Sequence, residues 1–462
     1  MFKIYNTLSK RIEEFLPLNP PTVTLYTCGP TVYDYTHIGN LRTYVGNDIL
    51  KRSLETNGYE VKHVMNITDV GHLVSDEDVG EDKIEKGARE SGRSVWEVAN
   101  FFEDHFWKST KSLNIKRANI VAKATDHIEE QIKLIHKLEK NGFIYITPQA
   151  IYFDITKFPT YTKLSGQKLE EKEVGARVDV VVDKHKKNPA DFALWFFTVG
   201  RFKDHVMKWP SPWGEGFPGW HIECSAMAME YLRDTIDIHT GGVDHISVHH
   251  TNEIAQSEAA TGKPFVKYWV HHNFLQVDGE KMSKSKKNFY RIEDLVQKGF
   301  DPLALRYLFL TAHYRDKLNF TWESLEAAQN ALNNLREIIR DWEEPKIGCA
   351  QFEKDFNEDA SNDLNMPQAV AIMWNMVRSD YPTSAKAKTL LEMDKILGLN
   401  LEQYLGKSID IPEEVMHLVS KREQARNEGD FKQSDKLRKE IKSKGYIIED
   451  TKTGPKVKSV VN

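Results

Sequence analysis

The sequence predicts an α/β fold in which a Rossmann-type parallel sheet is split by an insertion and followed by an α-helical bundle and a small C-terminal domain. Residues 22–70 alternate strand, helix and strand, which is the pattern of a βαβ unit. The composition changes at 145–220 to strand and loop rich in glycine, proline and aromatic residues, and the α/β pattern resumes at 236–277. From Pro302 onward the pattern is helical.

The first predicted strand ends, and the first predicted helix begins, around residues 28–40. The strand is indicated by Val23, Leu25 and Tyr26 among threonines, and the helix by apolar residues at helical spacing from Leu41 to Leu54. A turn of this kind lies at the carboxyl edge of a parallel sheet, and the helix start offers free N–H groups to phosphate. We therefore expect a nucleotide here, with His37 as an additional donor.

The remaining elements follow from the same patterns. A second strand is predicted at 59–67, a polar surface loop running into a helix at 71–90, and helix from Val95 to Asn141. After the insertion, strands are predicted at 236–238, 268–270 and 274–277, with a helix at 249–261 between them. Helices are predicted at 322–342 and 363–398, and a further helical stretch within 411–462 precedes the segment Gly445-Tyr446-Ile447-Ile448-Glu449-Asp450.

Composition limits the function classes. The chain has 462 residues, a formal net charge of −5 and 28% charged residues, so overall charge does not drive binding to nucleic acid and any RNA contact is local. No run of twenty apolar residues exists for a membrane span, and the first residues lack a signal-peptide core, so we expect a cytoplasmic protein. Three cysteines form no disulfide framework, and Cys349 is interpreted as core filler.

Two sets of residues could carry chemistry. His249 and Glu253 are four residues apart on a predicted helix and, with Cys28 and Cys224, make a donor set that suits zinc. A surface pair and two buried filler cysteines would produce the same spacing. The second set is residues 278–288, a glycine-started loop with two serines and four lysines, which reads either as a flexible phosphate clamp or as a solvated basic loop.

Two sequence motifs, found one after the other along the chain, decide between these alternative interpretations. His37-Ile38-Gly39-Asn40 and, far downstream, Lys281-Met282-Ser283-Lys284-Ser285 resemble the HIGH and KMSKS signatures of class I aminoacyl-tRNA synthetases. Within that class the chain resembles the cysteinyl-tRNA synthetase family over almost its whole length. The strings that carry this resemblance are those at 26–34, 66–69, 188–195, 213–214, 219–227 and 249–253.

The resemblance implies a reaction, its ligands and its site residues. Cysteine and ATP give cysteinyl adenylate, and the cysteinyl group then passes to the 3′ end of tRNA(Cys). The implied zinc ligands, one ion per subunit, are Cys28, Cys224, His249 and Glu253, and the zinc would bind the substrate thiolate. Mg²⁺ is expected with ATP. The implied ATP-binding residues are Gly29, Thr31, His37, Gly39, Asn40 and Lys284, the amino-acid contacts are Cys28, Thr68 and Trp220, and the catalytic residues are His37, Asn40, Lys281 and Lys284.

The resemblance also divides the chain into domains, and a monomer is favoured. Residues 1–115 would form the first half of the Rossmann catalytic domain, 116–220 the inserted subdomain, and 221–300 the second half with the KMSKS loop. Residues 301–405 would form a stem-contact and helical bundle domain, and 406–462 an anticodon-binding domain. Its candidate RNA contacts are Lys436, Arg438, Lys439 and Lys442, with a solvated helix face as the alternative.

The chain departs from the family pattern at two places. Asn40 stands where the signature has its second histidine, so the position can donate an N–H but does not titrate. Gly71-His72-Leu73 replaces an acidic run after Thr68-Asp69-Val70. Two other functions remain open: the cysteine ligase of mycothiol synthesis, which shares the catalytic region, and a noncatalytic RNA-binding relative. The helical and basic segments after residue 320 favour the synthetase over the first, and the intact signatures favour it over the second.

Overall fold

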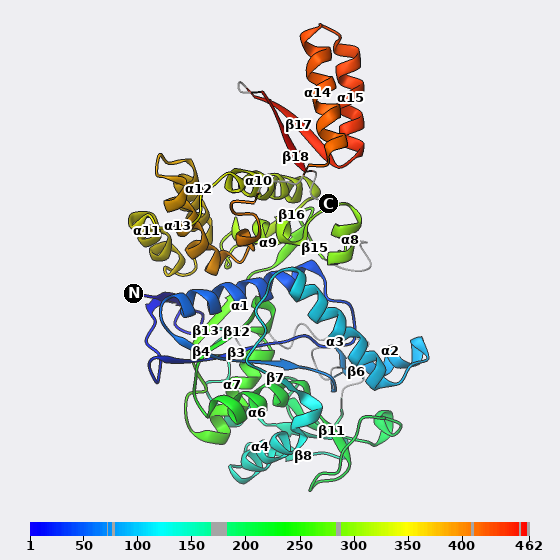
Figure 1. Cartoon of the computed structure of the whole chain (residues 1–462). Helices are drawn as coiled ribbons and strands as arrows, with labels where there is room; N and C mark the ends of the chain where they lie inside the picture. Colours follow the sequence, from blue (N-terminus) through cyan, green and yellow to red (C-terminus); the bar gives the residue numbers. More distant parts are fainter. Residues whose placement is uncertain are drawn as a thin grey trace. The chain divides into compact units, whose positions relative to one another are not determined.

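The structure is a computed structural model of the whole chain, and it describes residues 1–71, 73–75, 79–167, 183–282, 288–407, 411–451 and 454–459. The chain forms two compact units (Figure 1). The first comprises residues 1–291 together with 312–319 and 358–366, and the second comprises 292–311, 320–357 and 367–462. The two short segments in the first unit fall in the range that we assigned to the stem-contact domain.

The first unit is built on a five-stranded sheet in the order β13-β12-β3-β4-β7, and every neighbouring pair is parallel. The strands are β3 (Thr22–Thr27), β4 (Glu60–Ile67), β7 (Ile120–Lys123), β12 (Ile236–Gly242) and β13 (Val266–His272). Val23, Leu25 and Tyr26 are fully buried, as expected for a sheet covered on both faces. The strand order reverses between β3 and β12, and ligands of such sheets bind at the carboxyl ends of the strands on either side of this reversal.

Helices cover both faces of the sheet. Figure 1 shows α1 on one side and α6 and α7 on the other. The helices of the first unit are α1 (Ile38–Thr56), α2 (Lys83–Ser91), α3 (Val95–Ser112), α4 (Ile128–Lys140), α6 (Trp220–Leu232) and α7 (His249–Thr261). The predicted βαβ unit, β3-α1-β4, is confirmed, and so is the helix at 249–261.

The stretch predicted to be helical from Val95 to Asn141 is not continuous. It contains α3 and α4, but Ile120–Lys123 between them is β7, the edge strand of the parallel sheet. The run Ile120-Val121-Ala122 is too short to give a periodicity of its own, so the helical pattern on either side masked it. This strand lies inside the range 116–220 that we assigned to the insertion.

The insertion carries an antiparallel sheet in the order β11-β10-β9-β8, in agreement with the strand and loop composition. Its strands are β8 (Ile144–Ile146), β9 (Ala150–Phe153), β10 (Phe192–Phe197) and β11 (Gly216–Pro218). Phe153 and Phe192 stack across β9 and β10 with ring centroids 5.0 Å apart, and Trp195 is fully buried. The aromatic residues of this segment therefore form its core.

The segment 71–90 differs from the predicted polar surface loop. It contains a short antiparallel pair, β5 (Leu73–Ser75) and β6 (Val79–Asp82), before α2 begins. Asp82 is 1% exposed and Ile84 is fully buried, so part of the segment packs against the core. The predicted helix is confirmed by α2, whose Lys86, Arg89 and Glu90 are exposed. Asp82 caps α2 because its Oδ1 accepts hydrogen bonds from the N–H groups of Ile84 and Glu85.

Smaller sheets complete the set of strands. They are formed by β1 (Lys3–Asn6) with β2 (Arg11–Glu14), by β14 (Leu275–Val277) with β15 (Glu280–Lys281) and β16 (Leu318–Phe320), and by β17 (Tyr446–Thr451) with β18 (Gly454–Ser459). The strand predicted at 274–277 is therefore present, but it lies in the β14 sheet and not in the parallel sheet.

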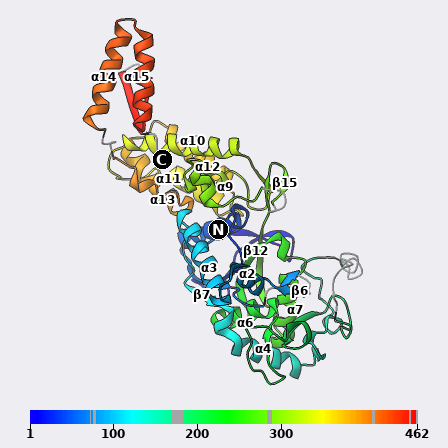
Figure 2. The same ribbon diagram turned by 90° about the vertical axis from the view of Figure 1, so that its right-hand side faces the viewer.

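The second unit is mainly helical and also contains the β17–β18 pair. Its helices are α8 (Ile292–Gln297), α9 (Pro302–Leu310), α10 (Trp322–Arg340), α11 (Ala350–Ala360), α12 (Met366–Arg378), α13 (Thr383–Leu397), α14 (Glu413–Asn427) and α15 (Phe431–Ser443), of which α11 and α12 begin or end in the first unit. The helix predicted at 322–342 is confirmed, whereas the run 363–398 is two helices separated at Pro382. Both views place α14 and α15 side by side (Figure 2), around a small core that contains Val415, Val419 and Ile441.

Candidate active site and metal-ligand cluster

The turn after β3 is fixed against the end of β4. Gly29 donates its N–H to Asn66 Oδ1 at 2.7 Å, and a Cβ at Gly29 would lie only 1.7 Å from the backbone oxygen of Asn66. Further along, Val32 N–H donates to the Thr68 carbonyl and Thr68 N–H to the Pro30 carbonyl. Glycine is required at position 29 because two backbones meet there. Thr68 is thereby held beside the 28–40 turn, as the sequence predicts for a substrate contact.

The first turn of α1 is closed by a capping box made from the signature residues. His37 Nδ1 accepts hydrogen bonds from the N–H groups of Gly39 and Asn40, at 3.1 and 3.2 Å. Asn40 Oδ1 in return accepts from His37 N–H at 3.3 Å. Because Nδ1 is an acceptor, the neutral His37 ring carries its proton on Nε2. The Asn40 side chain uses its oxygen within the cap, which leaves the amide NH₂ as its donor group.

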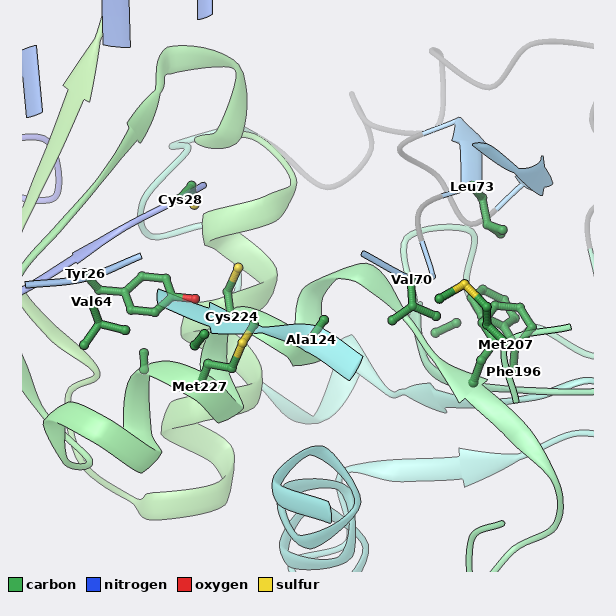
Figure 3. Packing of buried hydrophobic residues seen from close by; sticks show 14 of the residues in the cluster. Tyr26, Cys28, Val64, Val70, Leu73, Ala124, Phe196, Met207, Cys224 and Met227 are labelled. Carbon is green, nitrogen blue, oxygen red and sulfur yellow. The ribbon is translucent and has the colours of Figure 1, made fainter. Parts of the chain in front are cut away.

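Three elements bring the predicted metal ligands together. Cys28 directly follows β3, Cys224 lies on α6, and His249 and Glu253 lie one turn apart on α7. One ligand atom from each residue lies within 4.8 Å of those of the other three. All four side chains are buried, and Cys28 is the most exposed at 7%. Figure 3 shows Cys28 at the strand end and Cys224 on the helix, with the Tyr26 hydroxyl directed toward Cys224.

This donor set fits zinc. Two thiols, an imidazole and a carboxylate converge at a spacing that one tetrahedral ion can bridge, and zinc is the common metal for mixed sulfur and nitrogen ligands. A surface pair and filler cysteines, the alternative left open by spacing alone, would not place all four ligand atoms in one buried cluster. The fit rests on the chemistry and convergence of the side chains.

Burial determines the protonation of these groups. It raises the pKa of the Cys28 thiol, and it raises that of Cys224 well above its ordinary value, with the neighbouring Cys28 adding to the effect. Burial opposes the charged forms of His249 and Glu253 as well, but their mutual attraction outweighs it. The pKa of His249 rises to about 10, and the pKa of Glu253 is lowered by His239 and His249. A cation is therefore needed to ionise the thiols at neutral pH.

A layer of buried histidines lies behind the cluster. Cys28 Sγ is 3.3 Å from His250 Nε2, and His250 Nδ1 is 2.8 Å from His271 Nε2. Cys28, His239 and His250 also converge within 4.8 Å, and His239 Nε2 is 2.8 Å from Glu253 Oε2. Sequence reasoning missed these histidines, although all three follow a predicted strand or lie beside a predicted ligand. They orient Glu253 and Cys28 as outer-shell partners of ligands commonly do.

A cavity of about 480 Å³ opens onto both the cluster and the helix start. Its lining includes the predicted residues Cys28, Gly29, Thr31, His37, Gly39, Asn40, Thr68, Trp220, Cys224 and His249. Trp220 stacks on the His249 ring at 4.3 Å between centroids, and Thr68 donates its hydroxyl to Glu223 Oε2 at 3.0 Å. Glu253 lies behind His249 and is not in the lining.

Two predicted residues cannot be located in the described part of the chain, and the cavity contains residues that were not predicted. Lys284 and the side chain of Lys281 lie outside the described residues. The cavity is also lined by Tyr33, Lys83, Asp244 and His245, which sequence reasoning did not select. Lys83 lies in the segment 71–90, which the sequence predicts to be a polar surface loop running into a helix, because charged residues dominate the pattern there. Only the path of β5 and β6 brings it to the cavity.

Comparisons with known proteins identify the family of the chain. Residues 14–330 match the model of the family described as tRNA synthetases class I (C) catalytic domain, and residues 409–456 match the cysteinyl-tRNA ligase anticodon binding domain. The chain is 46% identical to Cysteine--tRNA ligase 1 of Burkholderia lata, covering 98% of this chain and 96% of the relative. It is 45% identical to Cysteine--tRNA ligase of Treponema denticola, covering 97% of each.

A solved structure shares the fold. Methionyl-tRNA synthetase of Mycobacterium tuberculosis in complex with methionyl-adenylate superimposes with a TM-score of 0.57 at 15% identity, over 83% of this chain and 91% of that one. No helix of the described residues is long and apolar enough to cross a membrane. The Rossmann-type sheet, the first signature beside its switch point and the full-length relatives lead to one conclusion: the chain belongs to the cysteine--tRNA ligase family of class I aminoacyl-tRNA synthetases.

Proposed function

We propose that this enzyme selects cysteine through zinc held by Cys28, Cys224, His249 and Glu253, and activates it at the start of α1. One observation carries the proposal: Cys28, Cys224 and His249 line the same cavity as His37 and Asn40. A metal-bound thiol and an ATP phosphate could therefore be held in one enclosed space. When bound there, zinc would ionise the substrate thiol and take it as a further ligand, which the harder, less acidic hydroxyl of serine does poorly.

The residues of this chain would orient the reactants for two transfers. The N–H groups at the start of α1, His37 Nε2–H and the Asn40 amide are the donors for the ATP phosphates. Lys284, with Lys281 nearby in sequence, would neutralise the departing pyrophosphate. Gly29, Thr31 and Gly39 would accommodate ATP, while Thr68 and Trp220 contact the amino acid. Mg²⁺ would accompany ATP.

This mode of selection explains why no proofreading is needed. A pocket built for a specific ligating atom rejects an isostere that lacks it by a large factor. The insertion then has no editing task. Cys28, Cys224, His249 and Glu253 would hold the zinc, and the ion would supply a further binding position for the substrate sulfur.

The acceptor is proposed to be tRNA(Cys), and the enzyme is proposed to act as a monomer in the cytoplasm. The match of residues 409–456 to an anticodon-binding family supports a tRNA acceptor over an amino-sugar acceptor. Lys436, Arg438, Lys439 and Lys442 are all exposed on α15, where an RNA backbone could reach them.

Zinc absorption spectroscopy on purified protein tests the selection mechanism. L-Cysteine should change the zinc K-edge spectrum by adding a sulfur ligand, and L-serine should not. Cys224→Ser should lose both the zinc and cysteine-dependent ATP–pyrophosphate exchange, whereas Cys349→Ser, a buried cysteine outside the cluster, should keep both. A zinc spectrum that is unchanged by saturating cysteine would overturn the proposed role of the metal.

A further inference from the structure

Lys83 is the first residue of α2, and its side chain reaches the cavity that holds the proposed ATP and cysteine sites. Among the described residues that line this cavity it is the one lysine or arginine. The acidic side chains in the same lining are Asp34 and Asp244. A half-buried ammonium group at this place supplies the positive charge that an anionic ligand requires.

The ammonium group of Lys83 is held toward the cavity. Its Nζ lies 4.9 Å from the centroid of the Tyr33 ring, within the range of a cation–π interaction. Tyr33 itself lines the cavity and lies on the turn between Cys28 and His37. This contact limits the freedom of a long side chain.

The backbone at Lys83 is anchored by the insertion. Asp82, the residue before it, caps α2. Glu85 Oε1 accepts a hydrogen bond from Val206 N–H at 2.6 Å. His205 stacks on Phe217 with centroids 3.8 Å apart, and its Nε2 lies 3.8 Å from Asp82 Oδ2, both atoms being buried. The start of α2 is thus fixed to the insertion, and the backbone of Lys83 is held in place beside the cavity.

We propose that Lys83 is a further ligand-binding residue of the activation step, whose ammonium group binds an anionic oxygen of the reactants. This inference rests on the proposed function, because that function supplies two such groups: the carboxylate of cysteine and the α-phosphate of ATP. Both become part of the same adenylate, so one cation beside the joining point would stabilise the negative charge that builds up there.

The test compares Lys83→Met, which keeps the aliphatic stem, with Lys86→Met, an exposed lysine of the same helix that is outside the cavity lining. Cysteine-dependent ATP–pyrophosphate exchange gives kcat and KM for cysteine and for ATP. Lys83→Met should lower kcat/KM by about 10- to 100-fold, as for the loss of one charged hydrogen bond. Lys83→Arg should recover part of it, and Lys86→Met should match the wild type.

Two analogues identify the anion. Inhibition constants are measured for cysteinol, which lacks the carboxylate, and for adenosine, which lacks the phosphates. If Lys83 binds the carboxylate, Lys83→Met weakens cysteine but not cysteinol; if it binds phosphate, the variant weakens ATP but not adenosine. Equal weakening of each substrate and its analogue, or wild-type kinetics in Lys83→Met, would overturn the proposal.

Two controls distinguish a failure of the proposed function from a failure of the role assigned to Lys83. Wild-type protein without any cysteine-dependent exchange would contradict the proposed function itself, whereas active wild type with an unaffected Lys83→Met contradicts only the role of Lys83. Lys83→Gln serves as a second variant if Lys83→Met melts at a lower temperature. Wild-type kinetics in a folded Lys83→Gln would then count against the proposal.

Discussion

At the scale of single residues, Asn40 has two tasks in this enzyme. Its Oδ1 closes the capping box with His37, and its amide group remains as a donor at the helix start. A histidine at this position, as in the usual signature, offers the N–H donor as well. The substitution in this chain therefore adds a capping oxygen, which the sequence alone did not reveal, and keeps a donor group for the proposed contact with phosphate.

Substitutions at Asn40 separate these tasks. Asn40→Asp keeps the capping oxygen but places a negative charge where a donor faces phosphate, so adenylate formation should fall about tenfold or more while the melting temperature stays near that of the wild type. Asn40→Ala should lose both, and Asn40→His should be tolerated. ATP–pyrophosphate exchange and thermal melting measure the two effects. Exchange in Asn40→Ala at the wild-type rate would contradict this assignment.

A second residue-scale effect concerns pH. His63 is buried on β4 beside the Thr27 hydroxyl, and burial, with a contribution from Lys51, lowers its pKa to about 3. The unfolded chain binds the proton near pH 6.5, so the stabilisation from neutral His63 is complete above pH 6.5 and is lost as the pH falls toward 3. This residue alone gives a slope of about 1.4 kcal/mol per pH unit.

His63→Gln should remove that slope. Denaturant titrations of the wild type and the variant between pH 8 and 5 give the free energy of unfolding of the catalytic unit. Below pH 6.5 the wild type should lose stability faster than the variant, and above pH 7 the difference between them should be constant. Parallel pH profiles over the whole range would show that His63 does not titrate on unfolding.

At the scale of elements, the contact between α6 and α7 determines the geometry of the proposed metal ligands. Gln256 on α7 donates its amide to the His221 carbonyl and to Ser225 Oγ on α6, and Ser257 Oγ lies 2.9 Å from the same hydroxyl. These buried polar contacts set the distance between Cys224 on one helix and the His249 and Glu253 pair on the other. Two helices joined in this way supply three of the four residues of the cluster.

Loss of this link should loosen the metal site. Gln256→Ala should weaken zinc binding by about 10- to 100-fold, as outer-shell substitutions do, without removing a ligand. Gln424→Ala, which deletes an exposed amide on α14, is the control and should bind zinc like the wild type. Competition with a chelator measures both affinities. Unchanged zinc affinity in Gln256→Ala would assign the helix spacing to hydrophobic packing alone.

At the scale of the whole molecule, the proposed activation site and the proposed tRNA contacts lie on different parts of the chain. Every described residue of the cavity belongs to the first unit, whereas the basic face of α15 belongs to the second. The two functions should therefore be separable by mutation, even though the chain is negatively charged overall.

A double substitution tests this separation. Lys436→Ala with Lys439→Ala should raise the KM for tRNA(Cys) in charging and reduce the salt dependence of tRNA binding by close to one unit of slope per lysine, because each contact releases about one counterion. ATP–pyrophosphate exchange should not change. The same substitutions made at Lys388 and Lys395 of α13 are the control. A loss of exchange in the α15 variant would contradict the separation.

Much of this enzyme could be predicted from local sequence. The strand, turn and helix of residues 22–56, the i, i+4 pair on α7 and the two signatures are local patterns whose physical meaning does not depend on distant parts of the chain. The ligand set of Cys28, Cys224, His249 and Glu253 came from the family resemblance, and spacing alone left it open. Short or polar segments could not be predicted from local sequence, as β7 and the β5-β6 pair illustrate.

Only the tertiary structure showed which side chains from distant segments lie close together. It placed Lys83 in the cavity by a path through β5 and β6, and it gathered His239, His250 and His271 behind Cys28. A sequence carries the chemistry of each side chain and the periodicity of each element, because both are local. Convergence of side chains from β3, β12, α2 and α7 depends on strand order and on helix packing, which are set by contacts between residues far apart in the chain.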